Sequence, residues 1–211
     1  MVSSPNIPDI VIGRLPIYLR ALTQMSQQGQ TFTSSHELGQ RLGISSAQIR
    51  KDLSLFGDFG KQGTGYQISH LLTQLKQILQ VNHEWPMIIV GAGDLGRALA
   101  HYRGFVSRGF RVVGVFDNDP AKIGMGNGDW QVYGMDQMVS FIHKRRVKIA
   151  MLAVPAETAQ EVSDRLVDAG IRAILSYAPI TLVVPSGVHV QYIDPVMHLQ
   201  RMTYYLKSDE R

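Results

Sequence analysis

The stretch IIVGAGDLGRALA, residues 88–100, has the residue types and spacing of a loop that holds phosphates. Its glycines at positions 91, 93 and 96 follow an apolar segment and precede a helix-forming one. The first glycine permits a sharp turn, the second lets a pyrophosphate approach the backbone, and the third lets helix and strand pack closely. Free N–H groups at the helix start then point at the phosphates. The spacing predicts a dinucleotide pocket.

An acidic residue is expected at the end of the next strand, and Asp117 stands there, 21 residues after Gly96. Its carboxylate can accept hydrogen bonds from adenine ribose hydroxyls and would repel a 2′-phosphate, which favours NAD(H) over NADP(H). Asp94 brings a negative charge into the loop, and Arg97 could offset it. Two alternatives stay open: Asp117 as a turn or N-cap residue before Pro120, and a loop that binds nothing or another nucleotide such as coenzyme A.

Two short helices joined by LGIS are predicted in the first part of the chain. Ser34 with Glu37, and Ser45 with Gln48, form capping-box patterns at their starts, and Gly43 is a candidate C-cap. The glycine-rich stretch FGDFGKQGTGY follows the second helix and suits a tight ribbon. This order of elements is typical of a winged helix-turn-helix, which inserts its second helix into the major groove of DNA.

The second helix carries side chains suited to a DNA duplex. Arginine can bond guanine, glutamine can pair with adenine, and lysine and hydroxyl groups suit phosphates. Asp52 is unusual on such a face, and we expect it to orient a neighbouring basic group or a residue of a partner domain. The alternative is a plain helical hairpin with a solvated face. The predicted DNA-binding residues are Ser45, Ser46, Gln48, Arg50, Lys51 and, on the ribbon, Lys61.

The remaining elements follow from apolar periodicity. A helix over 9–29 has an apolar face at Ile12, Leu15, Leu19 and Leu22, with Pro16 as a first-turn position or a kink. An amphipathic helix over 69–80 leads to a part where strands and helices alternate, which indicates a parallel sheet buried on both faces. Its strands are expected at 87–90, 111–116, 147–154, 171–175 and near Val190, and its helices at 94–102, 135–144, 156–169 and 195–206.

Composition narrows the class of protein. The chain has 211 residues, 45% of them hydrophobic, a formal net charge of +4 and no cysteine. The absence of cysteine excludes disulfides and thiolate chemistry and suits a reducing cytosol. The sequence shows neither a signal-peptide pattern nor an apolar run long enough for a bilayer. We therefore expect a cytoplasmic α/β protein with no membrane partner and no metal site.

The whole chain resembles the Rex family of redox-sensing transcriptional repressors. The resemblance is carried by RLPIYLRAL, TSSHELGQRLGISSAQIRKDLSLFGDFGKQGTGY, VGAGDLGRALAHYRGF, VFDNDPAKIG and YIDPVMHLQRMTYYL. It implies a winged-helix DNA-binding domain over 1–82, a Rossmann NAD(H)-binding domain with a parallel sheet over 83–194, and a helix over 195–211 exchanged between the subunits of a homodimer. Such a dimer binds double-stranded operator DNA when NADH is scarce and releases it when NADH binds.

The resemblance also assigns roles to residues. It gives Arg50 and Lys51 to DNA, and it pairs Tyr102 with Asp194 of the other subunit, with Arg20 engaging the same region. Two positions depart from some relatives, which can carry basic residues at Asp94 and Gln62. The cofactor residues implied are Gly91, Ala92, Gly93, Asp94, Leu95, Gly96, Arg97, Tyr102 and Asp117, with Ser176, Tyr177 and Pro179 bordering the nicotinamide.

The resemblance thus implies a repressor, not an enzyme, that senses the NADH/NAD+ ratio and leaves a palindromic operator when NADH binds. One rival is an NAD-dependent oxidoreductase, which would need a substrate pocket and usually an acid or base. Only residues 188–211 follow the nucleotide fold, too few for a substrate domain, and His101, His143 and His189 stand isolated. The other rival is a coenzyme A-binding Rossmann module.

Overall fold

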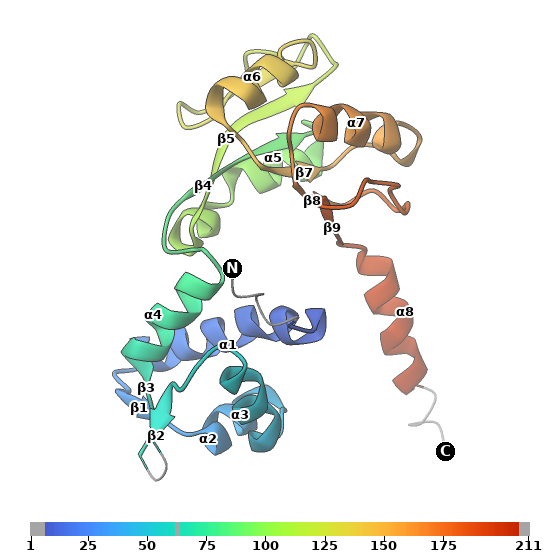
Figure 1. The fold of residues 1–211 in the computed structure, drawn as a ribbon. Coiled ribbons are helices and arrows are strands. Elements are labelled where there is room, and N and C mark those ends of the chain that lie inside the picture. The colour runs from blue at the N-terminus through green and yellow to red at the C-terminus, as the bar shows by residue number, and fades with distance from the viewer. Residues whose placement is uncertain (1–6, 62–63, 207–211) are drawn as a thin grey trace. The chain divides into compact units, whose positions relative to one another are not determined.

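The computed structural model describes residues 7–61 and 64–206. Contacts within the chain divide it into two compact units, Met1–His83 and Glu84–Arg211 (Figure 1).

The described residues of the first unit form four helices and a small antiparallel sheet of order β1-β3-β2. Its core is a single cluster of side chains from all four helices, with Leu15, Leu38, Ile49 and Leu71 fully buried. The elements are α1 (Asp9–Gln27), β1 (Phe32–Thr33), α2 (Ser35–Leu42), α3 (Ser46–Ser54), β2 (Gly60–Lys61), β3 (Gly65–Gln67) and α4 (Ile68–Ile78).

Both predicted N-caps are confirmed. The Ser34 hydroxyl accepts from the Glu37 N–H at 3.1 Å, and the Ser45 hydroxyl accepts from the Gln48 N–H at 3.2 Å. Gly43 ends α2 in the left-handed region with φ +66°, as a C-cap glycine does. Gly43, at the end of α2, and Ser45, at the start of α3, therefore set the turn between these two helices.

Two details of the first unit differ from the sequence prediction. Pro16 lies well inside α1 rather than in its first turn. The buried face of α1 is also turned from the expected one, because Ile12 is exposed while Tyr18 is fully buried.

The predicted ribbon of β2 and β3 forms, and β3 also pairs with β1 on its other side. Strand β1 was not predicted, because its two residues are too few to show a periodic pattern. At Gly65, a Cβ would lie 2.3 Å from the Thr33 carbonyl oxygen, so only glycine permits this strand pairing.

The second unit is a six-stranded, wholly parallel sheet in the order β6-β5-β4-β7-β8-β9. Counted along the chain, this is the 3-2-1-4-5-6 order of doubly wound nucleotide-binding folds, and it confirms the predicted Rossmann-type sheet. The strands are β4 (Trp85–Val90), β5 (Phe110–Asp117), β6 (Val132–Gly134), β7 (Ile149–Leu152), β8 (Ala173–Ser176) and β9 (His189–Tyr192).

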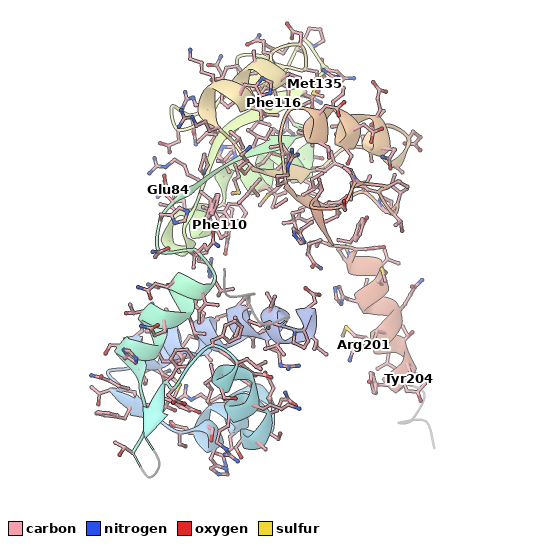
Figure 2. The ribbon with its side chains drawn as sticks, viewed as in Figure 1. Glu84, Phe110, Phe116, Met135, Arg201 and Tyr204 are labelled. Carbon is pink, nitrogen blue, oxygen red and sulfur yellow. The ribbon has the colours of Figure 1, made fainter. Side chains whose placement is uncertain are left out.

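Helices cover both faces of this sheet (Figure 1). One core contains Phe116 and the inner sides of α6 and α7, with Met135 packed against it (Figure 2). The other lies beneath α5 and contains the buried Trp130. Neither β6 nor η1 was predicted, since both are short and irregular in sequence. The helices are α5 (Asp94–His101), η1 (Arg103–Arg108, a 3₁₀ helix), α6 (Met138–Arg145), α7 (Ala156–Asp168) and α8 (Pro195–Leu206).

The last helix, α8, spans Pro195–Leu206 as predicted, and every one of its residues is exposed. Arg201 and Tyr204 project from it in Figure 2. Monomeric proteins rarely expose so much contiguous apolar surface unless it is an interaction site. The exposed apolar residues are Val196, Met197, Leu199, Met202, Tyr204, Tyr205 and Leu206.

Candidate functional site

The three glycines of the loop after β4 each meet a different spatial demand. Gly91 has φ +102°, and a Cβ there would lie 2.2 Å from the Ala153 carbonyl oxygen. A Cβ on Gly96 would lie 1.8 Å from the Gly91 carbonyl oxygen, so α5 could not pack this closely on β4. At Gly93 a Cβ would meet nothing within 4 Å. The open backbone at Gly93 is where a ligand can come close, as the spacing predicts.

A cavity of about 600 Å³ lies in front of this loop. The residues around it follow β4, β5 and β7, so it sits where the strand order reverses between β4 and β7. Doubly wound sheets bind their ligands at this reversal, outside the carboxyl ends of the strands. Five predicted cofactor residues line the cavity: Gly91, Gly93, Asp94, Leu95 and Asp117.

Asp117 lies at this cavity with 7% of its surface exposed. One carboxylate oxygen accepts from the Ala92 N–H at 2.6 Å and the other from the Asp119 N–H at 2.8 Å. Lys122 approaches both oxygens at 3.3–3.4 Å. Burial alone would raise the pKa of Asp117, but these bonds outweigh it and lower the pKa below its usual range. The group is therefore a charged acceptor whose contact with Lys122 is long enough to be exchanged for another donor.

Asp94 is the first residue of α5, and its charge is partly offset. The Arg97 guanidinium lies 2.6 Å from its carboxylate, one turn along the helix. The Asp94 side chain is fully exposed, so solvent screens the pair strongly. A negative charge nevertheless remains at the rim of the cavity, next to the helix start that would receive phosphates.

The other predicted cofactor residues do not line this cavity. Ala92 acts through its N–H on Asp117, Gly96 packs α5 on β4, and Arg97 holds Asp94. Ser176 is buried at the end of β8, and its hydroxyl accepts from the Ala178 N–H at 3.3 Å. The remaining three are half-buried or exposed: Tyr102, Tyr177 and Pro179.

Several lining residues were not predicted. Lys122 comes from the loop after Asp117, and its place five residues beyond a strand-end aspartate was the available signal. Ala153, Val154 and Pro155 follow β7, whose position beside β4 is a tertiary fact. The other unpredicted lining residues are Val90, Phe116, Asn118, Met135 and, on α7, Thr158, Glu161, Val162 and Arg165.

In the first unit, α3 presents the predicted DNA-binding side chains. Arg50 and Lys51 are exposed, and the Arg50 guanidinium donates to the Ser35 hydroxyl at 3.0 Å. Ser45 and Ser46 stand at the helix start, where Ser45 is the N-cap. The Lys61 side chain and the whole of Gln62 lie outside the described residues.

Asp52 turns away from this exposed face and is fully buried. The Arg14 guanidinium holds it with two hydrogen bonds, and Tyr18 and Gln48 donate to it as well. Asp52 thus orients a basic group, as expected, but that group is Arg14, 38 positions away, and not the neighbouring Arg50 or Lys51. Arg14, Tyr18 and Gln48 all belong to the first unit, so a residue of a partner domain is not needed to hold Asp52.

The residues assigned to a switch lie at accessible places. Tyr102 is 51% exposed, stacks edge-on against Phe105 and accepts from Arg108 at 3.1 Å. Arg20 is exposed on α1. The Asp194 carboxylate accepts from the Val196 N–H at 2.9 Å, which fixes the start of α8. Their pairing across subunits stays a prediction.

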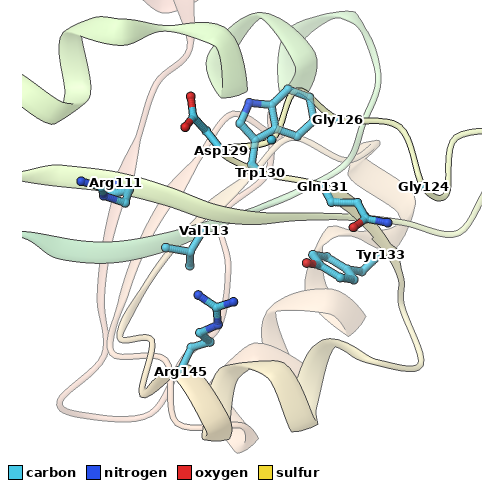
Figure 3. Close-up of a pocket in the computed structure, with 10 residues that line it drawn as sticks. Arg111, Val113, Gly124, Gly126, Asp129, Trp130, Gln131, Tyr133 and Arg145 are labelled. Carbon is cyan, nitrogen blue, oxygen red and sulfur yellow. The ribbon is translucent and has the colours of Figure 1, made fainter.

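A second cavity, of about 470 Å³, lies beside β5 and β6 (Figure 3). Arg111 and Arg145 bring positive charge to it, and Asp129 brings negative charge. Arg111 is paired with Glu84 at 2.6 Å, and the Arg145 guanidinium lies 5.3 Å from the centre of the Phe141 ring. This mixture of charges selects no class of ligand.

Within residues 7–61 and 64–206, no cluster of three or more potential metal-ligating His, Asp or Glu side chains occurs. In the same ranges no helix has the length and apolarity needed to cross a membrane. His101 donates its Nδ1–H to the Arg97 carbonyl oxygen at 2.7 Å, and its ring packs edge-on against Trp130 with the ring centres 5.0 Å apart. His101 therefore has a structural role in α5.

Sequence comparisons match both units and the chain as a whole. A family model described as putative DNA-binding protein N-terminus matches residues 6–54, and one described as CoA binding domain matches residues 82–180. The redox-sensing transcriptional repressor Rex of Roseiflexus sp. (strain RS-1) is 52% identical over 96% of this chain and 92% of its own length. That of Chloroflexus aggregans is 50% identical over 100% of both chains.

The chain belongs to the Rex family of redox-sensing transcriptional repressors.

Solved structures of a Rex-family repressor, RSP, show the same fold. The crystal structure of RSP in complex with beta-NAD+ and operator DNA matches with a TM-score of 0.91 and 37% identity, covering 97% of this chain and 94% of RSP. RSP in complex with beta-NADH matches with a TM-score of 0.89 and 35% identity, covering 97% and 96%. These Rex relatives are redox-sensing transcriptional repressors, and RSP forms complexes with both beta-NAD+ and beta-NADH.

Proposed function

We propose that this chain is a redox-sensing repressor that binds operator DNA through its first unit and leaves it when NADH binds its second unit. The observation that carries the proposal is the union, in one chain, of a winged helix with exposed Arg50 and Lys51 and a cavity at the reversal of a doubly wound sheet. Complexes of RSP with NADH, and with NAD+ and operator DNA, support both halves. A repressor of this kind carries out no reaction of its own.

The DNA-binding half is assigned to residues 1–82, with α3 as the recognition helix. The first residues of such a helix contact base edges. Ser45, Ser46 and Gln48 occupy that end of α3, Arg50 and Lys51 follow, and Lys61 of the wing is assigned to the DNA backbone. A positive formal charge on the chain favours approach to DNA.

The nucleotide half is assigned to residues 83–194. The pyrophosphate would lie against Gly93 and the start of α5, where backbone N–H groups and the helix dipole favour negative charge. Adenine ribose hydroxyls would replace the long contacts of Lys122 on Asp117. The nicotinamide would lie toward Ser176, Tyr177 and Pro179 after β8.

The active form is proposed to be a homodimer in which α8, residues 195–211, packs on the other subunit. The continuous apolar exposure of α8 in the single chain supports this. Tyr102 would pair with Asp194 of the other subunit, and Arg20 would engage the same region. Two-fold symmetry then requires a palindromic operator with half-sites about one DNA turn apart, roughly 34–36 Å.

Release follows if NADH binds one dimer shape better than the shape that fits DNA. A ligand with equal affinity for both shapes would shift nothing, and a full switch from 99:1 to 1:99 needs a difference of about 10⁴-fold. NAD+ differs from NADH only at the nicotinamide ring. The residues near that ring must therefore create the difference in affinity.

The direct test is a mobility shift on a palindromic site, titrated with NADH and then with NAD+. We expect NADH to release the DNA at concentrations where NAD+ does not. Equal binding with and without NADH would contradict the proposal. Fluorescence of bound NADH, measured with added coenzyme A, separates the coenzyme A alternative, since coenzyme A should not displace NADH.

Arg50→Ala tests the recognition helix. We expect operator affinity to fall by roughly ten- to a hundredfold while NADH fluorescence titrations stay unchanged, because Arg50 lies only in the DNA-binding unit. The matched control is Arg111→Ala, which removes an exposed arginine of the second unit and should leave operator affinity unchanged. Unchanged operator affinity in Arg50→Ala would show that the recognition helix is misassigned.

A further inference from the structure

A buried carboxylate joins α1 to the recognition helix. Asp52 is fully buried, although it follows directly after the exposed Arg50 and Lys51. The Arg14 Nε donates to one oxygen at 2.5 Å and its Nη2 to the other at 2.7 Å. Tyr18 donates its hydroxyl at 2.6 Å. These donors fix the position of the carboxylate relative to both helices.

Gln48 supplies the last donor. Its Nε2 lies 2.7 Å from Asp52 Oδ1, one helical turn away on α3. The backbone of Gln48 is also held, because its N–H donates to the Ser45 hydroxyl. Gln48 is thus fixed at both its main chain and its side chain, while it remains only half-buried.

The charge of Asp52 decides which way the Gln48 amide faces. Burial would raise the pKa of Asp52, but the bonds from Arg14, Tyr18 and Gln48 outweigh burial and lower the pKa. An ionised carboxylate only accepts hydrogen bonds, so the amide nitrogen must face it and the amide oxygen must face away. Bonds to a charged group are also the stronger ones.

The fixed amide keeps what base recognition needs. A glutamine that pairs with adenine uses its oxygen and one N–H, and the amide nitrogen carries two. One N–H can stay on Asp52 while the other N–H and the oxygen remain for a base edge. Because the Gln48 side chain is already ordered in the free protein, DNA binding loses less side-chain entropy there.

We propose that Asp52 is a positioning residue that presets the amide of Gln48, so that Gln48 reads one adenine in each operator half-site. This rests on the proposed function and adds a specificity-determining role to it. Asp52 itself does not touch DNA. Its effect on recognition is exerted through Gln48, separately from its role in holding α3 against α1.

The test is selection of binding sites from a random double-stranded DNA pool by the full-length chain, followed by affinity measurements on sites changed one base pair at a time. For Gln48→Met, which keeps the length of the side chain but cannot pair with a base, we expect roughly tenfold loss of preference at one position per half-site. All other positions should keep their preference. The matched control is Gln77→Met on α4, which should change no position.

Asp52→Asn separates positioning from packing. Asparagine can offer either an oxygen or an N–H to Gln48, so the amide is no longer fixed and the preference should weaken at that same position. Tyr18→Phe removes a donor to Asp52 without touching Gln48 and should leave the preference intact. If Asp52→Asn does not fold because Arg14 loses its counter-charge, the double variant Arg14→Met/Asp52→Asn removes both charges and gives the same reading.

Two results would overturn the proposal. One is a folded Asp52 variant that loses affinity equally for all sequences, which would mean that Asp52 only holds α3 in place. The other is Gln48→Met with an unchanged preference at every position. A wild-type chain that enriches no sequence at all would instead contradict the proposed function.

Discussion

Asp52 and Asp117 are both buried, both charged and both surrounded by donors, yet their surroundings differ. Side chains from two helices hold Asp52, and none of its surface is exposed. Asp117 is held mainly by backbone N–H groups, with Lys122 at longer distances, and it lines a cavity. The first carboxylate has only internal partners, whereas the second has one partner that a ligand could replace.

This difference separates a residue that positions from a residue that can bind. Backbone N–H groups cannot move away from Asp117, so the charge stays in place when Lys122 is displaced. At Asp52, a ligand could reach the carboxylate only by displacing side chains that hold α1 and α3 together. Burial and charge do not distinguish Asp52 from Asp117. The hydrogen-bond partners do, because only Asp117 has a partner that a ligand could replace.

The largest expected effect is on folding of the first unit in Asp52→Ala. The substitution leaves Arg14 and Tyr18 without their acceptor, and breaking a buried pair in this way costs about 3–5 kcal/mol. Hydrogen exchange followed by mass spectrometry should show lost protection in α1 and α3, with β4 unchanged. Full protection of α1 and α3 in the variant would show that the cluster contributes little to stability.

The next effect is on NADH affinity in Asp117→Ala. Loss of hydrogen bonds to a charged acceptor costs about 1.5–3 kcal/mol, which corresponds to roughly ten- to a hundredfold weaker binding. NADH fluorescence titration measures it. Asp129→Ala, which removes a carboxylate at the other cavity, is the matched control. An unchanged affinity in Asp117→Ala would leave Asp117 as a turn residue, the alternative that its bond to the Asp119 N–H fits.

Acid should remove the contribution of Asp52. The pKa of Asp52 is lowered in the folded chain, because the bonds from its donors outweigh burial. A lowered pKa gives stability that is complete above the unfolded value, about 3.9, and is lost as the pH falls through the folded value. Calorimetry of the wild type and Asp52→Asn should show a gap in melting temperature that is constant from about pH 7 to 5 and narrows below about pH 4. A melting-temperature gap that widens in acid would mean that the pKa of Asp52 is raised, not lowered, in the folded chain.

The smallest effect is expected at the rim of the cavity. Asp94→Asn removes the negative charge nearest the start of α5 and releases Arg97 from its pair. Both changes favour phosphates, but the site is exposed, so we expect only about two- to threefold tighter NADH binding. Titration at low and at 1 M salt measures it, and the gain should disappear at high salt. Weaker binding in Asp94→Asn would show that Asp94 serves the cofactor directly.

What the sequence predicted well was local. The glycine spacing, the strand-end position of Asp117 and the caps at Ser34 and Ser45 depend on residues a few positions apart. Long buried strands such as β4 also stood out by their continuous apolar runs. From these, the class of fold and the centre of the cavity could be predicted.

What it missed depends on contacts between distant residues. Thr158 and Arg165 reach the cavity because α7 follows β7, and β7 lies beside β4 only in the folded sheet. Similarly, Arg14 lies 38 positions before Asp52, so the sequence around Asp52 could not predict that Arg14 pairs with it. The short strands β1 and β6 have too few residues for a period to appear.

Both tryptophans of the chain, Trp85 and Trp130, belong to the second unit, one at the start of β4 and the other buried beneath α5. Indole emission therefore originates entirely from the half of the chain proposed to hold the cofactor. Quenching of that emission by reduced nicotinamide, which absorbs where indole emits, would follow occupancy of the cavity in the presence of DNA. A dye on α3 could then report detachment from the duplex at the same time, so that filling and release are timed in one sample.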